Sequence, residues 1–315
     1  MKTCAPLLFI LWITVILPAS LIAQTAPEDS YSVIGRWNLT LQKNGGEYPS
    51  WLEVNRSGFN RLTGYFVGIE GSARPVSEIR YSDTRDVYYF AIPPQWKRSG
   101  DDLYFEFSPV NGGLNGIQAE DGDTLSWTAV RAPDLRRDKP PVWGEPVDLL
   151  DDAMSHWIIP ENNRFRMDGG ILVNEAVGGN LITNETFDDF KLHVEFRYPE
   201  GSNSGIYLRG RYEVQIMDNY GEEPSSLTIG GIYGFIEPTV NAAKEADEWQ
   251  TLDITLAGRY VTIVLNGTEI ICNRPIPGIT GGALDGNEGQ PGPIMLQGDH
   301  GPVDFRKIVI TPAAD

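Results

Sequence analysis

Short apolar segments that alternate residue by residue run through the whole chain, and this feature most constrains its fold. Alternation with period two puts every second side chain on one face, which is typical of half-buried antiparallel strands. No comparable stretch has a helical period, so the chain is predicted to be all-β. In the first half these segments are Trp37/Leu39/Leu41, Leu52/Val54, Val87 to Ile92, Leu103/Phe105/Phe107 and Leu125/Trp127/Ala129.

The length of 315 residues favours two domains, and one segment separates them naturally. Residues 132–147 contain four prolines and no periodic apolar pattern, which predicts a linker. Residues 24–131 are then expected to form a smaller accessory domain, a β-barrel or a β-sandwich. Residues 148–315 are expected to form a sandwich of two sheets, with one face buried and the other lining a groove.

The N-terminus predicts export. Lys2 is followed by the apolar run Leu7 to Leu17 and by small residues, which is the pattern of a signal peptide over residues 1–23 with cleavage before Gln24. The mature protein would be periplasmic or extracellular, without a stable membrane span, because the apolar stretch is short for one. An uncleaved N-terminal anchor is the alternative.

The charge balance disfavours nucleic acid as a partner. The chain has 43 acidic and 25 basic side chains, a net charge of −18, and no long basic run. Binding to nucleic acid needs a clustered positive face, so such a partner is disfavoured. The acidity otherwise indicates solubility and does not specify a fold or an oligomeric state.

Two alternating segments of the second half are predicted to pair as a hairpin. Residues 190–196 and 206–216 alternate on either side of a turn at residues 199–202. Matching their apolar faces pairs Phe196 with Ile206 and Val194 with Leu208.

This register gathers polar side chains on one face of the hairpin. His193 would lie opposite Arg209, and Glu195 opposite Tyr207. Such a cluster could bind an oxygen-rich ligand through charge-assisted hydrogen bonds, or it could be a salt-bridged solvent face. Its members are His193, Glu195, Arg197, Tyr207, Arg209, Arg211, Glu213 and Gln215.

A glycine-flanked turn presents His300 as a second candidate. Strict alternation from Leu296 would direct this side chain towards the core, but Gly298 could form a bulge that resets the phase. His300 could then act as a general acid or base, or as a metal ligand.

Several ordered blocks of the second half resemble the DUF1080, or 3-keto-disaccharide hydrolase, family. The resemblance covers residues from about 143 to 312. The blocks are Asn203-Ser204-Gly205-Ile206-Tyr207-Leu208-Arg209, Tyr212-Glu213-Val214-Gln215-Ile216-Met217-Asp218-Asn219, Gly231-Ile232-Tyr233-Gly234, Asn241-Ala242-Ala243-Lys244, Glu248-Trp249, Leu265-Asn266-Gly267, Gly292 to Gly301 and Phe305-Arg306.

The resemblance implies a concanavalin-like jelly-roll sandwich that acts on glycosides whose sugar carries a 3-ketone. It implies groove positions for Arg209, Glu213, Gln215, Tyr233, Lys244, Gln297 and His300. Gln250 and Lys307 stand where the family usually has asparagine, which leaves the subfamily, and so the sugar and leaving group, open.

Cleavage of such a substrate needs a base for the proton on C2, an acid for the leaving oxygen and stabilisation of an enolate. Glu213 and His300 are the candidates for base and acid, with their roles open. Arg209, Gln215 and Lys244 would hold the ketone and hydroxyl groups, and His193 and Glu195 are further candidates for sugar binding. A divalent cation at the enolate, held by His300 with Glu213 or Asp218, is a fourth component to test.

Two other functions remain open. A glycoside hydrolase with two carboxylates is less favoured, because Gln215 occupies the place of a middle acid and Asp218 falls off the Glu213 face. A carbohydrate-binding protein without catalysis would use the same fold and groove. Release of the aglycone from a 3-keto-glucoside would distinguish these functions.

Overall fold

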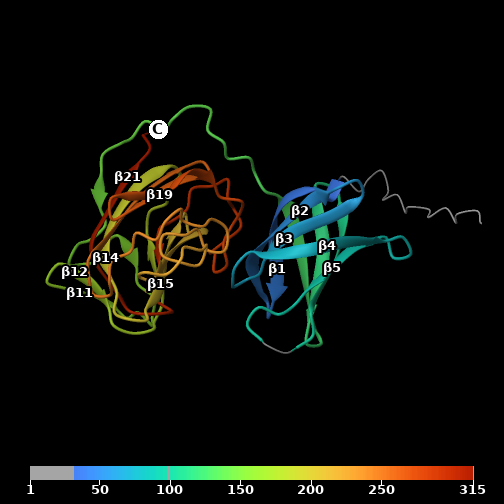
Figure 1. Ribbon diagram of the computed structural model, residues 1–315, viewed down its shortest axis with the longest axis horizontal. Coiled ribbons are helices and arrows are strands. Elements are labelled where there is room, and N and C mark those ends of the chain that lie inside the picture. Colours follow the sequence, from blue (N-terminus) through green and yellow to red (C-terminus); the bar gives the residue numbers. More distant parts are fainter. Residues whose placement is uncertain (1–31, 98–99, 315) are drawn as a thin grey trace, which may run out of the picture.

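The computed structural model describes residues 32–97 and 100–314 and shows two β-structured bodies joined by an extended segment (Figure 1). The all-β prediction is therefore confirmed. The predicted signal peptide, residues 1–23, lies outside the described residues. No helix within the described ranges has the length and apolar character that crossing a membrane requires.

The first body is a closed antiparallel barrel, which settles the choice between barrel and sandwich. Each strand pairs with the next, and β1 closes the ring by pairing with β8. Its interior is aromatic and aliphatic, with Phe90 and Phe105 stacked at 4.4 Å between ring centroids. The strands are β1 (Gly35–Lys43), β2 (Gly46–Ser57), β3 (Arg61–Val67), β4 (Arg74–Ser82), β5 (Val87–Ile92), β6 (Leu103–Val110), β7 (Gly113–Glu120) and β8 (Asp123–Arg131).

The second body consists of two antiparallel sheets that share one hydrophobic core. The five-stranded sheet has the order β10 (Trp157–Ile158), β13 (Leu181–Thr183), β20 (Met295–Leu296), β15 (Asn203–Leu208) and β16 (Tyr212–Met217). The larger sheet has the order β11 (Phe165–Asp168), β12 (Ile171–Asn174), β21 (Val303–Pro312), β14 (Phe190–Arg197), β17 (Gln250–Ala257), β18 (Tyr260–Leu265) and β19 (Thr268–Pro275), with β9 (Val147–Asp148) also paired to β21.

The predicted pairing of β14 with β15 is wrong. β14 pairs with β17 and β21 in the larger sheet, whereas β15 pairs with β16 and β20 in the smaller one. The turn at residues 199–202 carries the chain from one sheet to the other, so the two strands contribute apolar side chains to the same core from opposite sides. Alternation predicts which face a side chain takes, but it does not identify the strand's partner.

Two tight turns determine which side chains share a face. Asn266 and Gly267, predicted as a hairpin turn, have φ angles of 50° and 80°, the left-handed values that such a turn requires. Arg209 and Gly210 form a second turn of this kind, with φ angles of 53° and 65°. Arg209 therefore sits at the tip of the β15–β16 hairpin, and the alternation that grouped it with Glu213 does not extend through it.

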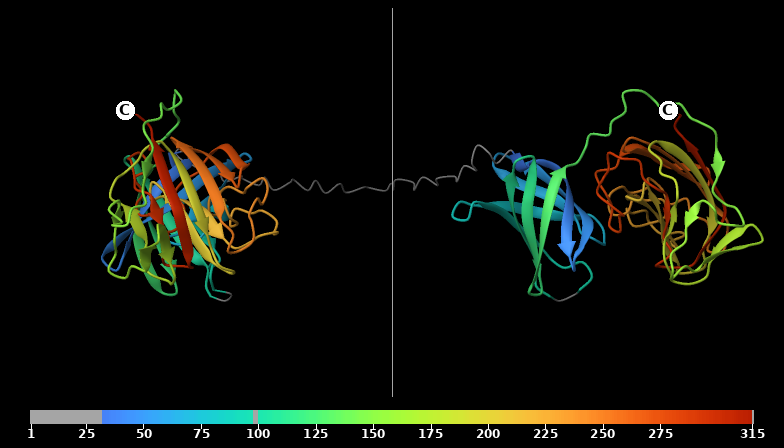
Figure 2. Two further views of the ribbon diagram at one scale, coloured as in Figure 1. Left: turned by 90° about the vertical axis from the view of Figure 1, so that its left-hand side faces the viewer. Right: turned by 180° about the vertical axis from the view of Figure 1, so that it is seen from behind.

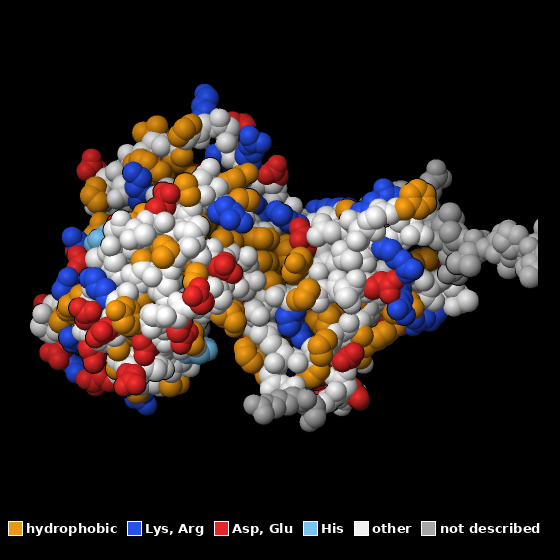
Figure 3. Space-filling model, in the orientation of Figure 1, with side chains coloured by type: hydrophobic (Ala, Val, Ile, Leu, Met, Phe, Trp, Pro, Cys, Tyr) orange, Lys and Arg blue, Asp and Glu red, His pale blue; other side chains and the backbone are white. Residues whose placement is uncertain are grey.

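The barrel is anchored to the sandwich by an aromatic side chain on its outer surface. Trp51 of β2 is fully buried in the hydrophobic core of the second body, where it meets Phe235 edge to face at 5.3 Å between centroids. Val67 of β3 joins the same core. Hydrophobic side chains border this contact in the space-filling view (Figure 3), and Figure 2 shows the two bodies adjacent from behind as well.

Candidate active site

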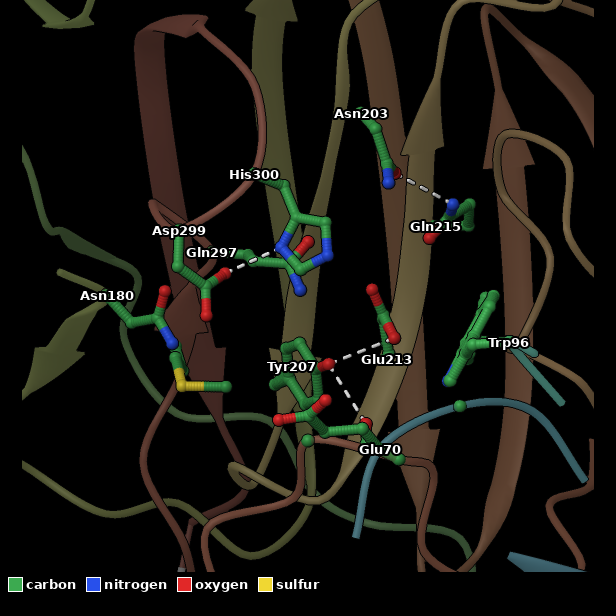
Figure 4. A pocket seen from close by; sticks show the side chains of 15 residues that line it. Glu70, Trp96, Asn180, Asn203, Tyr207, Glu213, Gln215, Gln297, Asp299 and His300 are labelled. Carbon is green, nitrogen blue, oxygen red and sulfur yellow. Dashed lines mark hydrogen bonds and ion pairs between the residues drawn. The ribbon is translucent and has the colours of Figure 1, made fainter. Parts of the chain in front are cut away.

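A pocket of about 520 Å³ lies where the smaller sheet faces the barrel (Figure 4). Its wall includes side chains from β15 and β16, from the segment after β20, and from the barrel. The wall holds three acidic residues, Glu70, Glu213 and Asp299, with one histidine and no lysine or arginine.

Glu213 lies at the centre of this pocket. On β16 it is directly opposite Tyr207 of β15, and it is almost fully buried, with 4% of its surface exposed. Its carboxylate lies directly above Gly205 on the neighbouring strand. A Cβ atom at residue 205 would lie 2.5 Å from the Glu213 Oε1 atom, so only glycine leaves room for the carboxylate in this position.

The Tyr207 hydroxyl lies between the Glu213 carboxyl group and a backbone carbonyl. The hydroxyl oxygen of Tyr207 lies 3.0 Å from Glu213 Oε2 and 3.0 Å from the carbonyl oxygen of Gly281. A hydroxyl group has one proton, and the carbonyl oxygen can only accept. Both contacts are satisfied when Tyr207 donates to Gly281 and a protonated Glu213 donates to Tyr207.

Electrostatics agree with a protonated Glu213. Burial disfavours the ionised carboxylate and raises the pKa of Glu213 to about 8, against opposing contributions from Tyr207 and His300. Burial likewise raises the pKa of Tyr207 well above its ordinary value. At neutral pH the pocket therefore holds a carboxylic acid that can give up a proton.

His300 and Asp299 form a hydrogen-bonded pair beside Glu213. The Nδ1 atom of His300 lies 2.7 Å from Asp299 Oδ1, and this hydrogen bond raises the pKa of His300 and lowers that of Asp299. Asn180 accepts the backbone N–H of Gly298 at 2.8 Å and contacts Asp299, which fixes the turn. With Nδ1 donating to Asp299, Nε2 of His300 is the atom free to accept a proton.

Amide side chains complete the polar lining. Gln215 is buried and donates through Nε2 to Asn203 Oδ1 at 3.0 Å. The side-chain Oε1 atoms of Gln215 and Gln297 are buried and accept no hydrogen bond among the described residues. An unpaired buried acceptor is costly, so these oxygens are suited to receive hydroxyl donors from a bound sugar.

The pocket brings together five of the residues selected from the sequence: Glu213, His300, Gln215, Tyr233 and Gln297. Tyr207, a member of the predicted polar face, also lines it, as do Asn203, Asn180 and Asp299, which were not selected. Tyr207 belonged to the predicted polar face and Asp299 adjoins His300, so both carried a signal in the sequence.

Two of the predicted cationic residues lie elsewhere. Arg209 is fully buried, with Nη2 2.9 Å from Asp189 Oδ1 and Nε donating to the carbonyl of Asp188, so its guanidinium stabilises the fold. Lys244 donates through Nζ to the carbonyl of Trp249 at 2.8 Å. The pocket thus contains neither of the cations expected to hold the ketone.

His193 and Glu195 lie on β14, on the side of the larger sheet opposite the core. His193 Nδ1 is 2.7 Å from Asp253 Oδ1, and Glu195 Oε2 is 2.6 Å from Arg306. Of the two interpretations left open for the polar face, the salt-bridged solvent face describes these residues. The ligand-facing interpretation fits Tyr207, Glu213 and Gln215, which line the pocket.

The residues expected to hold a cation do not form a metal site. Among the described residues, no group of three or more His, Cys, Asp and Glu side chains is arranged to hold a metal ion. Asp218 lies outside the pocket and accepts the backbone N–H of Gly201 at 2.8 Å. The donor set of the described residues therefore does not fit a metal ion.

Comparison with known proteins gives a family match for the second body. The family described as 3-keto-alpha-glucoside-1,2-lyase-like domain matches residues 145–311. A crystal structure from Parabacteroides distasonis ATCC 8503, named provisionally as a glycosyl hydrolase, is 26% identical and covers 56% of this chain and 92% of its own, with a TM-score of 0.46. A second structure with the same name and organism is 22% identical, covers 53% and 98%, and has a TM-score of 0.44. No curated protein matches the chain.

Proposed function

Because the chain belongs to the 3-keto-alpha-glucoside-1,2-lyase-like domain family, we propose that it cleaves the glycosidic bond of 3-keto-glycosides by elimination followed by hydration. The observation that carries this proposal is the placement of the buried Glu213, whose pKa burial raises to about 8, beside the His300–Asp299 pair in one pocket. We assign the two stacked sheets to the concanavalin-like jelly rolls as part of the same proposal.

The elimination uses His300 as base and Glu213 as acid. The C3 carbonyl acidifies the proton on C2, and Nε2 of His300 removes it while Asp299 stabilises the resulting imidazolium. The C2–H electron pair forms a C1–C2 double bond, the C1–O bond breaks, and the leaving oxygen takes the proton of Glu213. The products are an enone and the free aglycone.

Hydration then restores both side chains. The ionised Glu213 takes a proton from water as the water oxygen bonds to C1, and the protonated His300 returns a proton to C2. The net reaction is hydrolysis. Negative charge on the C3 oxygen has to be stabilised by neutral donors, for which the pocket offers the hydroxyl of Tyr233 and the amide of Asn203.

One comparison of substrates tests the proposal. The protein is incubated with a 3-keto-glucoside and with the unoxidised glucoside, and release of the aglycone is followed. We expect cleavage of the keto substrate alone, with deuterium at C2 of the sugar product when the reaction is run in D₂O. Equal activity on both substrates would contradict elimination and favour a two-carboxylate hydrolase, whereas binding without turnover would favour a carbohydrate-binding protein.

We also propose export to the periplasm or the extracellular space, on the basis of the signal peptide that the sequence predicts over residues 1–23. N-terminal sequencing of the protein recovered outside the cytoplasm is expected to begin at Gln24. A mature chain that begins at Met1 would contradict cleavage.

A further inference from the structure

The barrel contributes side chains to the pocket of the second body. Glu70, Gly71 and Trp96 all belong to the barrel, and all three line the pocket that contains Glu213 (Figure 4). Glu70 and Gly71 lie between β3 and β4, and Trp96 lies between β5 and β6. The family match begins at residue 145 and therefore does not include these residues.

Close backbone contacts fix this part of the barrel against the pocket. The N–H of Gly282 donates to the carbonyl of Ile69 at 2.9 Å. A Cβ atom at Gly281 would lie 2.3 Å from the carbonyl oxygen of Gly71, so the two backbones are in direct contact. The carbonyl of Gly281 also accepts the hydroxyl of Tyr207, so one residue separates the barrel from the Tyr207–Glu213 contact.

The segment bearing Trp96 is tied to the same loop. Gln95 donates through Nε2 to Ser72 Oγ at 3.0 Å, and its amide packs against Gly71. The indole of Trp96 is nevertheless 70% exposed and stacks on no other aromatic ring among the described residues. A large aromatic surface that adjoins an anchored residue and stays uncovered is costly in water and is suited to a ligand with a flat apolar face.

We propose that the barrel forms the subsite for the leaving group, in which Trp96 packs against the apolar face of a second pyranose ring and Glu70 accepts its hydroxyl groups. This inference rests on the proposed function and adds to it that the barrel, which lies outside the family match, recognises the leaving group. In Figure 4, His300 and Trp96 lie on opposite sides of Glu213. The base at C2 and the acid at the leaving oxygen therefore place the oxidised sugar on the His300 side and the departing sugar on the Trp96 side.

The test compares two substrates that share the oxidised sugar. One is a 3-keto-disaccharide, and the other is methyl 3-keto-glucoside, whose leaving group is too small to reach Trp96. We expect Trp96→Ala to lower kcat/KM for the disaccharide about 10-fold, the order of magnitude for uncovering one aromatic contact, and to leave the methyl glycoside within about 2-fold. Trp96→Phe should recover much of the loss. Phe59→Ala, at another exposed aromatic residue of the barrel, is the matched control and should change neither substrate.

The outcomes separate this inference from the proposed function. Equal losses on both substrates, or no loss on either, would overturn the leaving-group subsite while leaving the elimination chemistry intact. If the wild-type protein cleaves neither keto substrate, the proposed function fails. Calorimetric titration with the 3-keto-disaccharide then tests the subsite alone, and equal affinity of the wild type and Trp96→Ala would overturn it.

Discussion

The pocket and the outer face of the larger sheet contain the same residue types in different surroundings. In the pocket, Glu213 is buried without a cation in hydrogen-bond contact, and burial raises its pKa to about 8. On the outer face, partial burial would raise the pKa of Glu195, but hydrogen bonds from Arg306 and His193 hold it below its ordinary value. Arg306 also stacks over Trp249 at 4.4 Å from the ring centroid.

The two glutamates therefore differ in charge state: Glu195 is ionised and paired with a cation, whereas the buried Glu213 has no cationic hydrogen-bond partner and can hold a proton. An acid can transfer its proton near neutral pH only if its surroundings disfavour the ionised form. Glu195 is ionised and paired, so it has no proton to give. The two regions thus provide matched pairs of variants, one for reaction and one for control.

The largest effect is expected for Glu213→Gln. The amide keeps the shape and the hydrogen-bond donor of a protonated carboxyl, so the fold should be retained, but it cannot transfer a proton. We expect kcat on a 3-keto-glycoside to fall by about 10³-fold or more, as for loss of a general acid. Glu195→Gln should retain the wild-type rate. An equal loss in both variants would contradict the assignment of Glu213 as the catalytic acid.

His300→Gln should have the next largest effect. Glutamine can hydrogen-bond to Asp299 but cannot accept the proton from C2, so we expect a fall in kcat of about 10²-fold or more. His193→Gln on the outer face removes only partly exposed contacts with Asp253 and Glu195 and should leave kcat unchanged. Steady-state kinetics with one keto substrate measures both, and an active His300→Gln would assign the base elsewhere.

Gly205→Ala tests the space under the Glu213 carboxylate. The new Cβ atom would displace that carboxylate from Tyr207, and we expect kcat to fall about 10-fold or more, because displacements of about 1 Å are costly in a site. Gly289→Ala is the matched control, since its Cβ atom would make only ordinary contacts with Pro133 at 3.7 Å. Full activity of Gly205→Ala would contradict the requirement for glycine.

The smallest effect is a shift in the pH profile of kcat/KM. The rate should rise as His300 loses its proton, above the ordinary histidine pKa, and fall near pH 8 as Glu213 ionises. Asp299→Asn replaces the charged acceptor that raises the pKa of His300 with a neutral one, so the acidic limb should move to lower pH. If the acidic limb does not move, Asp299 does not control the pKa of the catalytic base.

The strands and their inward faces could be predicted from the sequence. Alternation placed Ile206, Val214 and Ile216 in the core, and all three are fully buried. It could not assign β14 and β15 to different sheets, because strands that pair and strands that face each other across a core show the same pattern. For the same reason His193 and Glu195 were grouped with Glu213, although they lie on different sheets.

The site residues that lie in motifs of the second body could be predicted from the sequence. Those that reach the pocket through the contact between the two bodies could not. Glu213, Gln215 and His300 lie in motifs that belong to one domain. The prediction that Arg209 faces the pocket was wrong, because Arg209 adopts a left-handed turn conformation that interrupts the alternation. Glu70 and Trp96 reach the pocket only because the barrel docks through Trp51, and no local pattern around residues 70 or 96 records that contact.

Trp51 belongs to the barrel but is buried in the core of the sandwich, and this has a thermodynamic consequence. A side chain that is fully buried across a boundary loses its hydration only while both bodies are folded, so the unfolding of either one exposes apolar surface of the other. The barrel and the sandwich are therefore coupled in their melting. Calorimetry should record one endotherm for the intact protein, and Trp51→Ala should split it into two.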